Sequence, residues 1–436
     1  MFPVTALVAG SSLLAGANAQ SVFAHYMIGA VDASTDHAER DIQDAIAVGL
    51  DAFAMNVGDP TAGWTNDTVQ QLFAAAEGTE FSLFFSFDMF QYSTLADHVS
   101  LFNAYRDHPN YFVTGADNLP VVSSYGGSGQ PDDWASFKQS SEVYLIPNLD
   151  DGASGGGSTG PYYTDPAGEL SEFNDIVDGY FSWESAWPAS TGGPENISAT
   201  GDQVVMEFAH NSGKDYMMGL SFLQFKDTSD GNWYRIGEVN FPERMTQILE
   251  LKPEFTEVIT WNDGGESHYI SNLWEEAYTT VPEILEYANT DEWPHDGWQP
   301  LISSFITAFK AGKGADEMEP PGDEPIGAMW YRGMLKTCSE NPPGNVESAI
   351  DSVNYAIVLP PASEGMSIRV SSGGNTLGET PAQPGLNYAA VAGMTTGEQK
   401  VELLDSSGSA TLSATSGKDV TNDDHCNFNF NVVRLE

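Results

Sequence analysis

The chain has 436 residues, of which 62 are acidic and 16 are basic, so its formal net charge at pH 7 is −46. An apolar content of 41% with 11% aromatic residues excludes a disordered chain and a collagen-like one. The sequence has no run of Lys and Arg that would neutralise phosphates, so we expect neither nucleic acid nor an anionic membrane as a partner. Neutral ligands meet no such repulsion. The acidic composition fits an extracellular protein that acts at mildly acidic pH, and it fits equally well a charge that only keeps the protein soluble.

The N-terminus has the pattern of a secretory signal peptide. Met1–Ala19 is apolar and ends in Ala17-Asn18-Ala19, the small-x-small form of a cleavage site, although it lacks the usual positive charge. A buried N-terminal helix is the alternative. We expect residues 1–19 to be removed and the protein to be secreted, either free outside the cell or associated with the cell wall.

Two further features fit a secretory route. Asn66 and Asn196 begin N-x-[S/T] sequons, so we expect them to carry N-glycans. The two cysteines, Cys338 and Cys426, would form a disulfide in an oxidising compartment and staple one terminal domain. No apolar stretch after the signal peptide approaches the ~18 residues of a membrane span, so we expect no membrane anchor.

Between Ser21 and Lys313, short apolar runs alternate with stretches of helical period, a pattern typical of βα units around a parallel sheet. Most of the runs are almost continuously apolar, as buried parallel strands are. Eight strands are expected, at residues 22–28, 51–57, 81–87, 119–125, 143–147, 179–183, 217–222 and 257–261.

The helices between these strands are marked by apolar stripes and by start and stop signals. One stripe at i, i+3, i+4, i+7 consists of Val69, Leu72, Phe73 and Ala76. An earlier helix is expected to start at Ser34 and Thr35 and to stop at Gly49. Eight βα units in about 290 residues match a TIM-type (β/α)8 barrel, which we predict for residues 20–313. A doubly wound sheet is the alternative, but the first βα turn lacks its G-x-G-x-x-G motif.

A change of composition marks the end of this region. Residues 312–325 are rich in Gly, Pro and acidic residues, and helical patterns are missing beyond them. Strand patterns recur instead, at residues 356–359, 367–370, 401–404 and 428–432. We therefore predict a C-terminal β-sandwich over residues 314–436, which would bind carbohydrate or brace the barrel.

In a parallel barrel, function gathers at the carboxyl ends of the strands. The residues that follow the expected strands combine carboxylates with indoles and phenols, a mixture that suits the apolar faces and hydroxyl groups of sugar rings. We expect these side chains to line a site for a neutral carbohydrate, with contacts to the sugar from the aromatic, amide and imidazole groups and Glu184. The set is His25, Asn56, Asp88, Tyr125, Trp183, Glu184, Trp261, Asn262, Asp263, Glu266 and His268.

Two carboxyl groups are needed to hydrolyse a glycosidic bond, one protonated and one ionised. Asp263 and Glu266 lie three residues apart around Gly264-Gly265, which allows the loop to fold tightly and bring both into one cleft. We expect no metal and no cofactor, because there is no H-E-x-x-H motif and the histidines are isolated in the sequence.

These residues resemble glycoside hydrolase family 71, the fungal α-1,3-glucanases or mutanases. The resemblance rests mainly on residues 260–270, and also on residues 23–29, 49–56, 85–89, 293–301 and 330–332. It implies a (β/α)8 catalytic domain with a β-sandwich, secretion, and hydrolysis of α-1,3-glucan with inversion. Gly265 is a departure, because a larger residue, often aromatic, is expected before the glutamate, and the wall of a subsite would differ.

The resemblance also implies roles for three carboxylates. Glu266 would be the general acid and Asp263 the base for the attacking water, with Asp88 positioning that water or sharing the base role. An inverting pair is separated by ~6.5 to 9.5 Å and a retaining pair by ~5 to 5.5 Å, so the structure bears on this assignment.

Two other functions share most of these features. One is a non-catalytic glucan-binding wall protein, which would be expected to lack one of the carboxylates. The other is a barrel hydrolase for a different glucan, such as a β-1,3 or α-1,4 polymer. Under the favoured hypothesis the partner is α-1,3-glucan, as polysaccharide or oligosaccharide, and the enzyme acts as a monomer.

Overall fold

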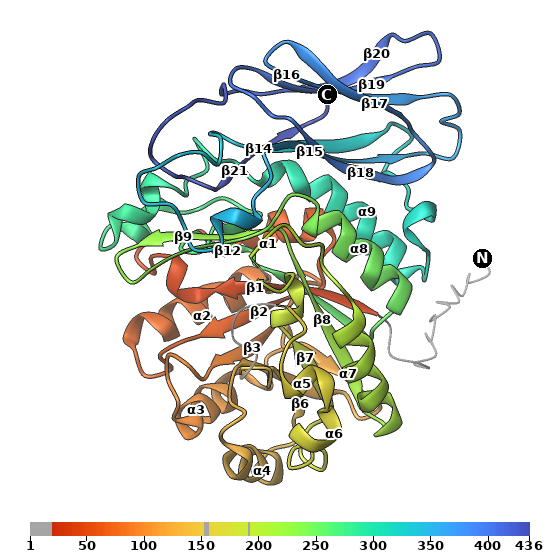
Figure 1. Ribbon diagram of the computed structural model, residues 1–436. Coiled ribbons are helices and arrows are strands. Elements are labelled where there is room, and N and C mark those ends of the chain that lie inside the picture. The colour runs from red at the N-terminus through yellow and green to blue at the C-terminus, as the bar shows by residue number, and fades with distance from the viewer. Residues whose placement is uncertain (1–19, 152–156, 191) are drawn as a thin grey trace, which may run out of the picture.

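The computed structural model describes residues 20–151, 157–190 and 192–436. An α/β part is covered on one side by a C-terminal β part, the blue strands in Figure 1. The predicted signal peptide lies outside the described residues, so cleavage after Ala19 stays a prediction. In the described part of the chain, no helix is both long enough and apolar enough to cross a membrane.

The α/β part is built on parallel strands that agree with the expected ones to within two residues at either end. They are β1 (Ser21–Met27), β2 (Ala52–Val57), β3 (Ser82–Asp88), β5 (Leu119–Tyr125), β6 (Tyr144–Pro147), β7 (Gly179–Ser182), β8 (Asp215–Ser221) and β11 (Phe255–Ile259). Their residues are almost all buried on both faces, which explains the continuous apolar runs in the sequence.

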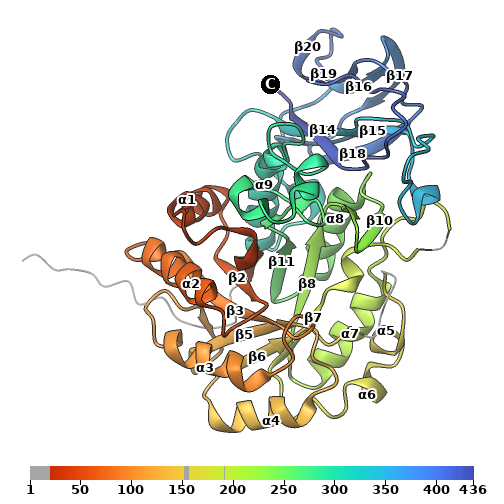
Figure 2. The same cartoon turned by 90° about the vertical axis from the view of Figure 1, so that its left-hand side faces the viewer.

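These strands form one curled sheet in the order β6-β5-β3-β2-β1-β11-β8-β7, with the short β4 (Val113–Thr114) antiparallel to β5 (Figure 2). The two ends of the sheet, β6 and β7, meet through one isolated parallel bridge between Asn148 and Phe181. Each of these strands has only four residues, too few for a longer ladder. The α/β class and the curled parallel sheet are confirmed, whereas a fully closed (β/α)8 barrel stays a prediction.

Helices connect the strands and cover the outside of the sheet (Figure 2). They are α1 (Ala38–Val48), α2 (Gly63–Ala76), α3 (Leu95–Tyr105), α4 (Pro131–Ser140), α5 (Pro161–Thr164), α6 (Pro166–Glu169), α7 (Thr200–Asn211), α8 (Asn240–Leu251) and α9 (Gln299–Lys310). The expected stripe on α2 is buried, and Gly49 caps α1 at a φ of 97°. The expected start of α1 at Ser34 and Thr35 is wrong, because both residues bond to Asp32 in a turn before the helix.

Two β-hairpins follow strands at the carboxyl edge of the sheet and were not expected. One comprises β9 (Gln224–Thr228) and β10 (Gly231–Arg235), which follow β8. The other comprises β12 (Asn262–Asp263) and β13 (His268–Tyr269), which follow β11. Both hairpins contribute side chains to the candidate site.

The C-terminal part consists of two four-stranded antiparallel sheets. The first has the order β18 (Gly385–Ala392), β15 (Ser352–Leu359), β14 (Ile326–Arg332), β21 (Phe430–Arg434), and the second has the order β17 (Asn375–Pro381), β16 (Ser367–Ser372), β19 (Gln399–Leu404), β20 (Ala410–Thr415). Alternate residues of β15 face opposite sides: Val353 and Ile357 pack toward the second sheet, whereas Ala356 and Val358 join the core of the α/β part. Strands β14, β17, β18 and β20 were missed by the sequence analysis.

A disulfide staples this C-terminal part, as expected. Cys338 and Cys426 are bonded, with Cα atoms 5.4 Å apart and a sequence separation of 88. The expected boundary near residue 313 falls between α9 and β14. The hydrophobic core continues across this boundary, since Trp330 of β14 contacts Trp298 at a ring distance of 5.9 Å. The division into domains stays a prediction.

Candidate active site

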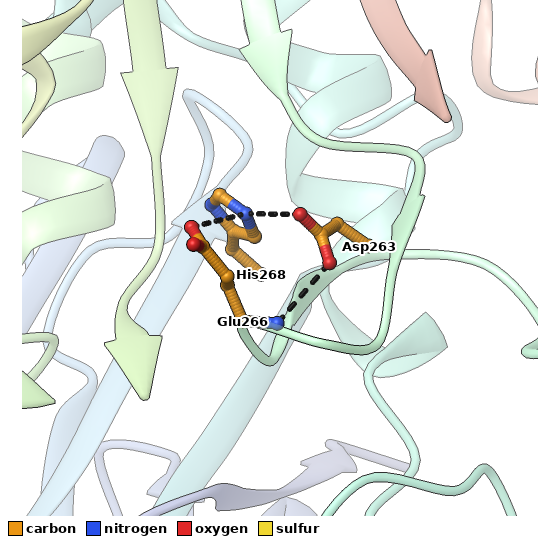
Figure 3. A group of neighbouring side chains, drawn as sticks. All are labelled: Asp263, Glu266 and His268. Atoms are coloured by element: carbon orange, nitrogen blue, oxygen red, sulfur yellow. Dashed lines mark hydrogen bonds and ion pairs between the residues drawn. The ribbon is translucent and has the colours of Figure 1, made fainter. Parts of the chain in front are cut away.

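The hairpin β12–β13 places three polar side chains together at the carboxyl edge of the sheet. Asp263 and His268 are opposite each other in its antiparallel register. The His268 Nε2 atom lies 3.0 Å from Asp263 Oδ2 and 3.5 Å from Glu266 Oε2. The backbone N–H of Glu266 donates to Asp263 Oδ1 at 3.1 Å, which closes the turn. Figure 3 shows His268 between the two carboxyl groups.

The surroundings push the pKa values of the two carboxyl groups in opposite directions. Burial alone would raise the pKa of Asp263, but the hydrogen bond and charge of His268 and the Glu266 N–H outweigh it and hold that pKa below its usual value. Burial and the neighbouring Asp263 charge raise the pKa of Glu266. Such a separation is typical of a carboxyl pair in which one group holds a proton, here Glu266, and the other is ionised, here Asp263.

The separation of this pair disagrees with the expectation for an inverting acid and base. One oxygen of Asp263, one of Glu266 and the His268 nitrogen all lie within 4.8 Å of one another. That is shorter than the ~6.5 to 9.5 Å that leaves room for a water molecule between two carboxyl groups. The short separation does not fit Asp263 as a base that acts through a water held between the two groups, and the shared base role expected for Asp263 and Asp88 stays a prediction.

The third predicted carboxylate, Asp88, ends β3, which is three strands from β11 along the sheet. The backbone N–H groups of Phe90 and Gln91 donate to its Oδ1 at 3.1 and 3.0 Å, and Asn56 Nδ2 lies 3.4 Å from its Oδ2. Burial raises the pKa of Asp88 despite these donors. Asp88 is thus fixed on another part of the same rim as Asp263 and Glu266.

A group of aromatic side chains lies on the same rim of the sheet. Trp183 is in ring contact with Tyr125 at 4.9 Å and with His25 at 4.8 Å. Burial is the main cause that raises the pKa of Tyr125. The charges of Glu184 and Glu266 lie close enough to raise this pKa further. Tyr125, Trp183 and Asp88 therefore share one region of the rim, as the sequence analysis expected.

A buried carboxyl group supports the loop after β7. Asp150 Oδ2 accepts hydrogen bonds from the backbone N–H groups of Trp183 and Glu184, each at 2.8 Å, and from the Tyr163 hydroxyl at 2.5 Å. Burial, followed by the Glu184 charge, raises the pKa of Asp150 to about 7. Glu184 itself pairs with Arg235 at 3.0 Å. Asp150 thus positions Trp183 and Glu184 at the rim.

Six of the eight predicted substrate contacts are buried, and four of them are bound to other parts of the protein. Trp261 is 0% exposed and packs on Phe53, and the Asn262 amide binds the backbone of Met27 on β1 at 2.8 and 3.2 Å. His268 contacts Asp263 and Glu266, and the His25 Nδ1 atom binds Glu257 at 2.7 Å inside the sheet. Substrate contacts from these side chains stay a prediction.

Three side chains near the site were missed. Gln224 on β9 donates an amide hydrogen bond to Glu266 Oε2. Arg235 on β10 lies over the ring of Trp187 at 4.9 Å, and that ring is 5.9 Å from His268. The predicted set holds no residue after the seventh expected strand, although Gln224 follows β8 by only three residues.

The cluster of Asp263, Glu266 and His268 also bears on the expectation that no metal is bound. The histidines were regarded as isolated, yet His268 and the two carboxylates offer three donor atoms within 4.8 Å. Two carboxylates and an imidazole are suitable ligands for a divalent cation such as zinc. In the structure these side chains contact one another and Gln224, and the expectation that no metal is bound stays a prediction.

The predicted glycosylation sites are accessible. Asn66 is exposed on α2, where its Oδ1 accepts a hydrogen bond from the Tyr105 hydroxyl at 3.1 Å. Asn196 is exposed in the loop before α7, 3.4 Å from Glu243. Occupancy of both sites stays a prediction.

Comparisons with known proteins show the family of the chain. The model of glycosyl hydrolase family 71 matches residues 18–436. A mutanase of Penicillium rubens is 31% identical over 446 residues, which cover 98% of this chain and 91% of that protein. A glucan endo-1,3-alpha-glucosidase of Schizosaccharomyces pombe is 30% identical over 344 residues, which cover 77% of this chain and 73% of that protein.

A solved structure shares the fold. The GH99 endo-alpha-mannosidase of Bacteroides thetaiotaomicron aligns with 67% of this chain and 98% of its own, at a TM-score of 0.51 and 11% sequence identity. At that identity the likeness concerns the fold alone. The match of the family model and of both relatives along most of the sequence identifies the chain as a glycoside hydrolase that belongs to glycosyl hydrolase family 71.

Proposed function

We propose that this enzyme is a secreted α-1,3-glucanase that hydrolyses the glucosidic bonds of α-1,3-glucan. The observation that carries the proposal is the pair of carboxyl groups, Glu266 and Asp263, whose pKa values are shifted in opposite directions around His268. The names of the two relatives support α-1,3-glucan as the substrate. The presence of Asp88, Asp263 and Glu266 argues against a protein that only binds glucan.

In the proposed mechanism Glu266 protonates the leaving glycosidic oxygen, because its raised pKa keeps the proton available. Asp263 stays ionised, which keeps the proton on Glu266 until it is transferred, and His268, held by Asp263, stabilises the charge that forms on Glu266 once its proton has left. We assign the activation of water to Asp88, because Asp263 lies too close to Glu266 to leave room for a water molecule between them. Asp88 ends β3 on the same rim, opposite Tyr125 of β5, and Tyr125 is near enough to Glu266 for the Glu266 charge to act on its pKa.

This assignment corresponds to inversion at the anomeric carbon, and the product distinguishes it from retention. Water activated by Asp88 on the face opposite Glu266 would release the β-anomer from an α-linked chain. The short separation of Asp263 and Glu266 would instead suit a retaining enzyme in which Asp263 is the nucleophile. In that case the first product would be the α-anomer.

The catalytic roles are tested by conservative replacements. Glu266→Gln and Asp88→Asn should each lower turnover by about 10² to 10⁴ while the midpoint of thermal unfolding changes little, since both side chains keep their size. Asn66→Gln is the control, because it removes a predicted glycan site on the exposed face of α2, away from the carboxylates, and should leave turnover as it is. Full activity of Glu266→Gln would contradict the proposal.

We also propose the cellular context and the completed architecture. Residues 1–19 would be removed on secretion, so the secreted protein should begin at Gln20 when its N-terminus is sequenced. The curled sheet would act as a (β/α)8 barrel closed at Asn148 and Phe181, with the C-terminal sheets bracing it. A secreted protein that still begins at Met1 would contradict the first part.

A further inference from the structure

Phe90 is an exposed aromatic residue beside the catalytic rim. Its side chain is 61% exposed, and it follows β3 only two residues after Asp88. A phenylalanine that is left in water forgoes about 1.5 to 3 kcal/mol of burial free energy, so packing gives no reason for its position. The residue was not among the predicted site residues.

The exposed ring is nevertheless held in a defined place. It contacts the ring of Tyr125 at 5.3 Å. It also lies against Gly126, where an added Cβ would be 2.7 Å from Phe90 Cε2 and where φ is +76°. The Phe90 backbone N–H donates to Asp88 Oδ1 at 3.1 Å. Only glycine at position 126 permits this close approach, so the ring is preorganised despite its exposure.

Phe90 extends the aromatic group of the site outward. Ring contacts run from Phe90 to Tyr125 at 5.3 Å and from Tyr125 to Trp183 at 4.9 Å. Tyr125 is partly exposed, and Trp183 is held by Asp150. A row of rings that begins at the catalytic carboxylates and ends in solvent fits a chain of sugar rings, each with an apolar CH face.

We propose that Phe90 forms a glucan-binding subsite, in which its ring stacks on the CH face of a glucose unit next to the units held at Asp88. The ligand class is a neutral pyranose chain, and the inference rests on the proposed function because the chain is the substrate. Tyr125 continues the stacking surface toward the cleavage point. The subsite makes the enzyme favour long chains over short oligosaccharides, because only a long chain reaches Phe90.

The test compares Phe90→Ala with Phe90→Trp on a soluble α-1,3-glucan of high mass and on the shortest α-1,3-oligosaccharide that the enzyme cleaves. Phe90→Ala should raise KM for the long chain about tenfold, with less than a twofold change in kcat, and should alter KM for the short substrate much less. Phe90→Trp should restore the KM for the long chain. Val113→Ala on β4 is the matched control, because Val113 is also exposed, at 43%, but precedes β5 at the other edge of the sheet.

The outcomes separate this inference from the proposed function. A wild-type enzyme that cleaves α-1,3-glucan while Phe90→Ala has an unchanged KM for the long chain overturns the subsite alone. Equal KM increases on both substrates also overturn it, since a distortion of Asp88 would act on every substrate. A wild-type enzyme that cleaves only another glucan overturns the proposed function. The KM values of wild type and Phe90→Ala on long and short chains of that glucan then test the subsite at Phe90.

Discussion

Replacement of His268 by Phe tests how the catalytic pair is tuned. His268 Nε2 is shared between Asp263 Oδ2 at 3.0 Å and Glu266 Oε2 at 3.5 Å, and the phenyl ring removes this shared group. His268 lowers the pKa of Glu266 in the wild type, so its loss should raise that pKa. A hydrogen bond to an ionised group contributes about 1.5 to 3 kcal/mol, which corresponds to a rise of about 1 to 2 pKa units.

The assay is the pH dependence of kcat/KM. Glu266 must be protonated to act as the acid, so its higher pKa in His268→Phe moves the alkaline limb upward by about 1 to 2 pH units, while the maximal rate falls. His268→Gln offers an amide donor near the same place and should recover part of the rate. An alkaline limb that stays where it is in the wild type, or moves to lower pH, would refute the proposed tuning of the pair.

Three other predictions concern stability and composition of the site. Replacing both Cys338 and Cys426 by Ser should lower the free energy of unfolding, measured by denaturant titration, by about 4 kcal/mol. An unchanged free energy of unfolding would mean that the disulfide does not stabilise the fold. Burial raises the pKa of Asp41 to about 6, so the folded state keeps a proton that the unfolded state releases, and stability due to Asp41 is lost as the pH rises from about 4 to 6. Asp41→Asn removes this loss and should gain up to roughly 3 kcal/mol relative to the wild type between those pH values; parallel stability curves would contradict the assignment. Dialysis against EDTA should leave turnover unchanged, because the proposed mechanism needs only proton transfer from Glu266 and activation of water by Asp88, and a loss that zinc or calcium restores would reveal a metal at the cluster of Asp263, Glu266 and His268.

The sequence predicted the buried strands well because burial on both faces produces continuous apolar runs. It missed β17 and β20, which are polar and mostly exposed, so they give no apolar run. It also missed the hairpin β12–β13, since strands of two residues are too short to show a period.

For the site, the sequence identified the three carboxylates but not how their neighbours point. Trp261 and Asn262 directly precede Asp263, yet both are buried and only Asp263 reaches the rim. A run of polar and aromatic residues after a strand does not reveal which of them face inward. His268 and Gln224 became visible as partners of Glu266 only once the two hairpins were placed side by side at the rim.

The most direct test of the account is incubation of the purified protein with insoluble α-1,3-glucan, β-1,3-glucan and starch in parallel, with new reducing ends counted and the product anomer followed by NMR. The account predicts hydrolysis of α-1,3-glucan alone, with the β-anomer as the first product. Hydrolysis of β-1,3-glucan or starch in place of α-1,3-glucan would contradict the proposed substrate, and an initial α-anomer would contradict the role of Asp88 and assign Asp263 as the nucleophile.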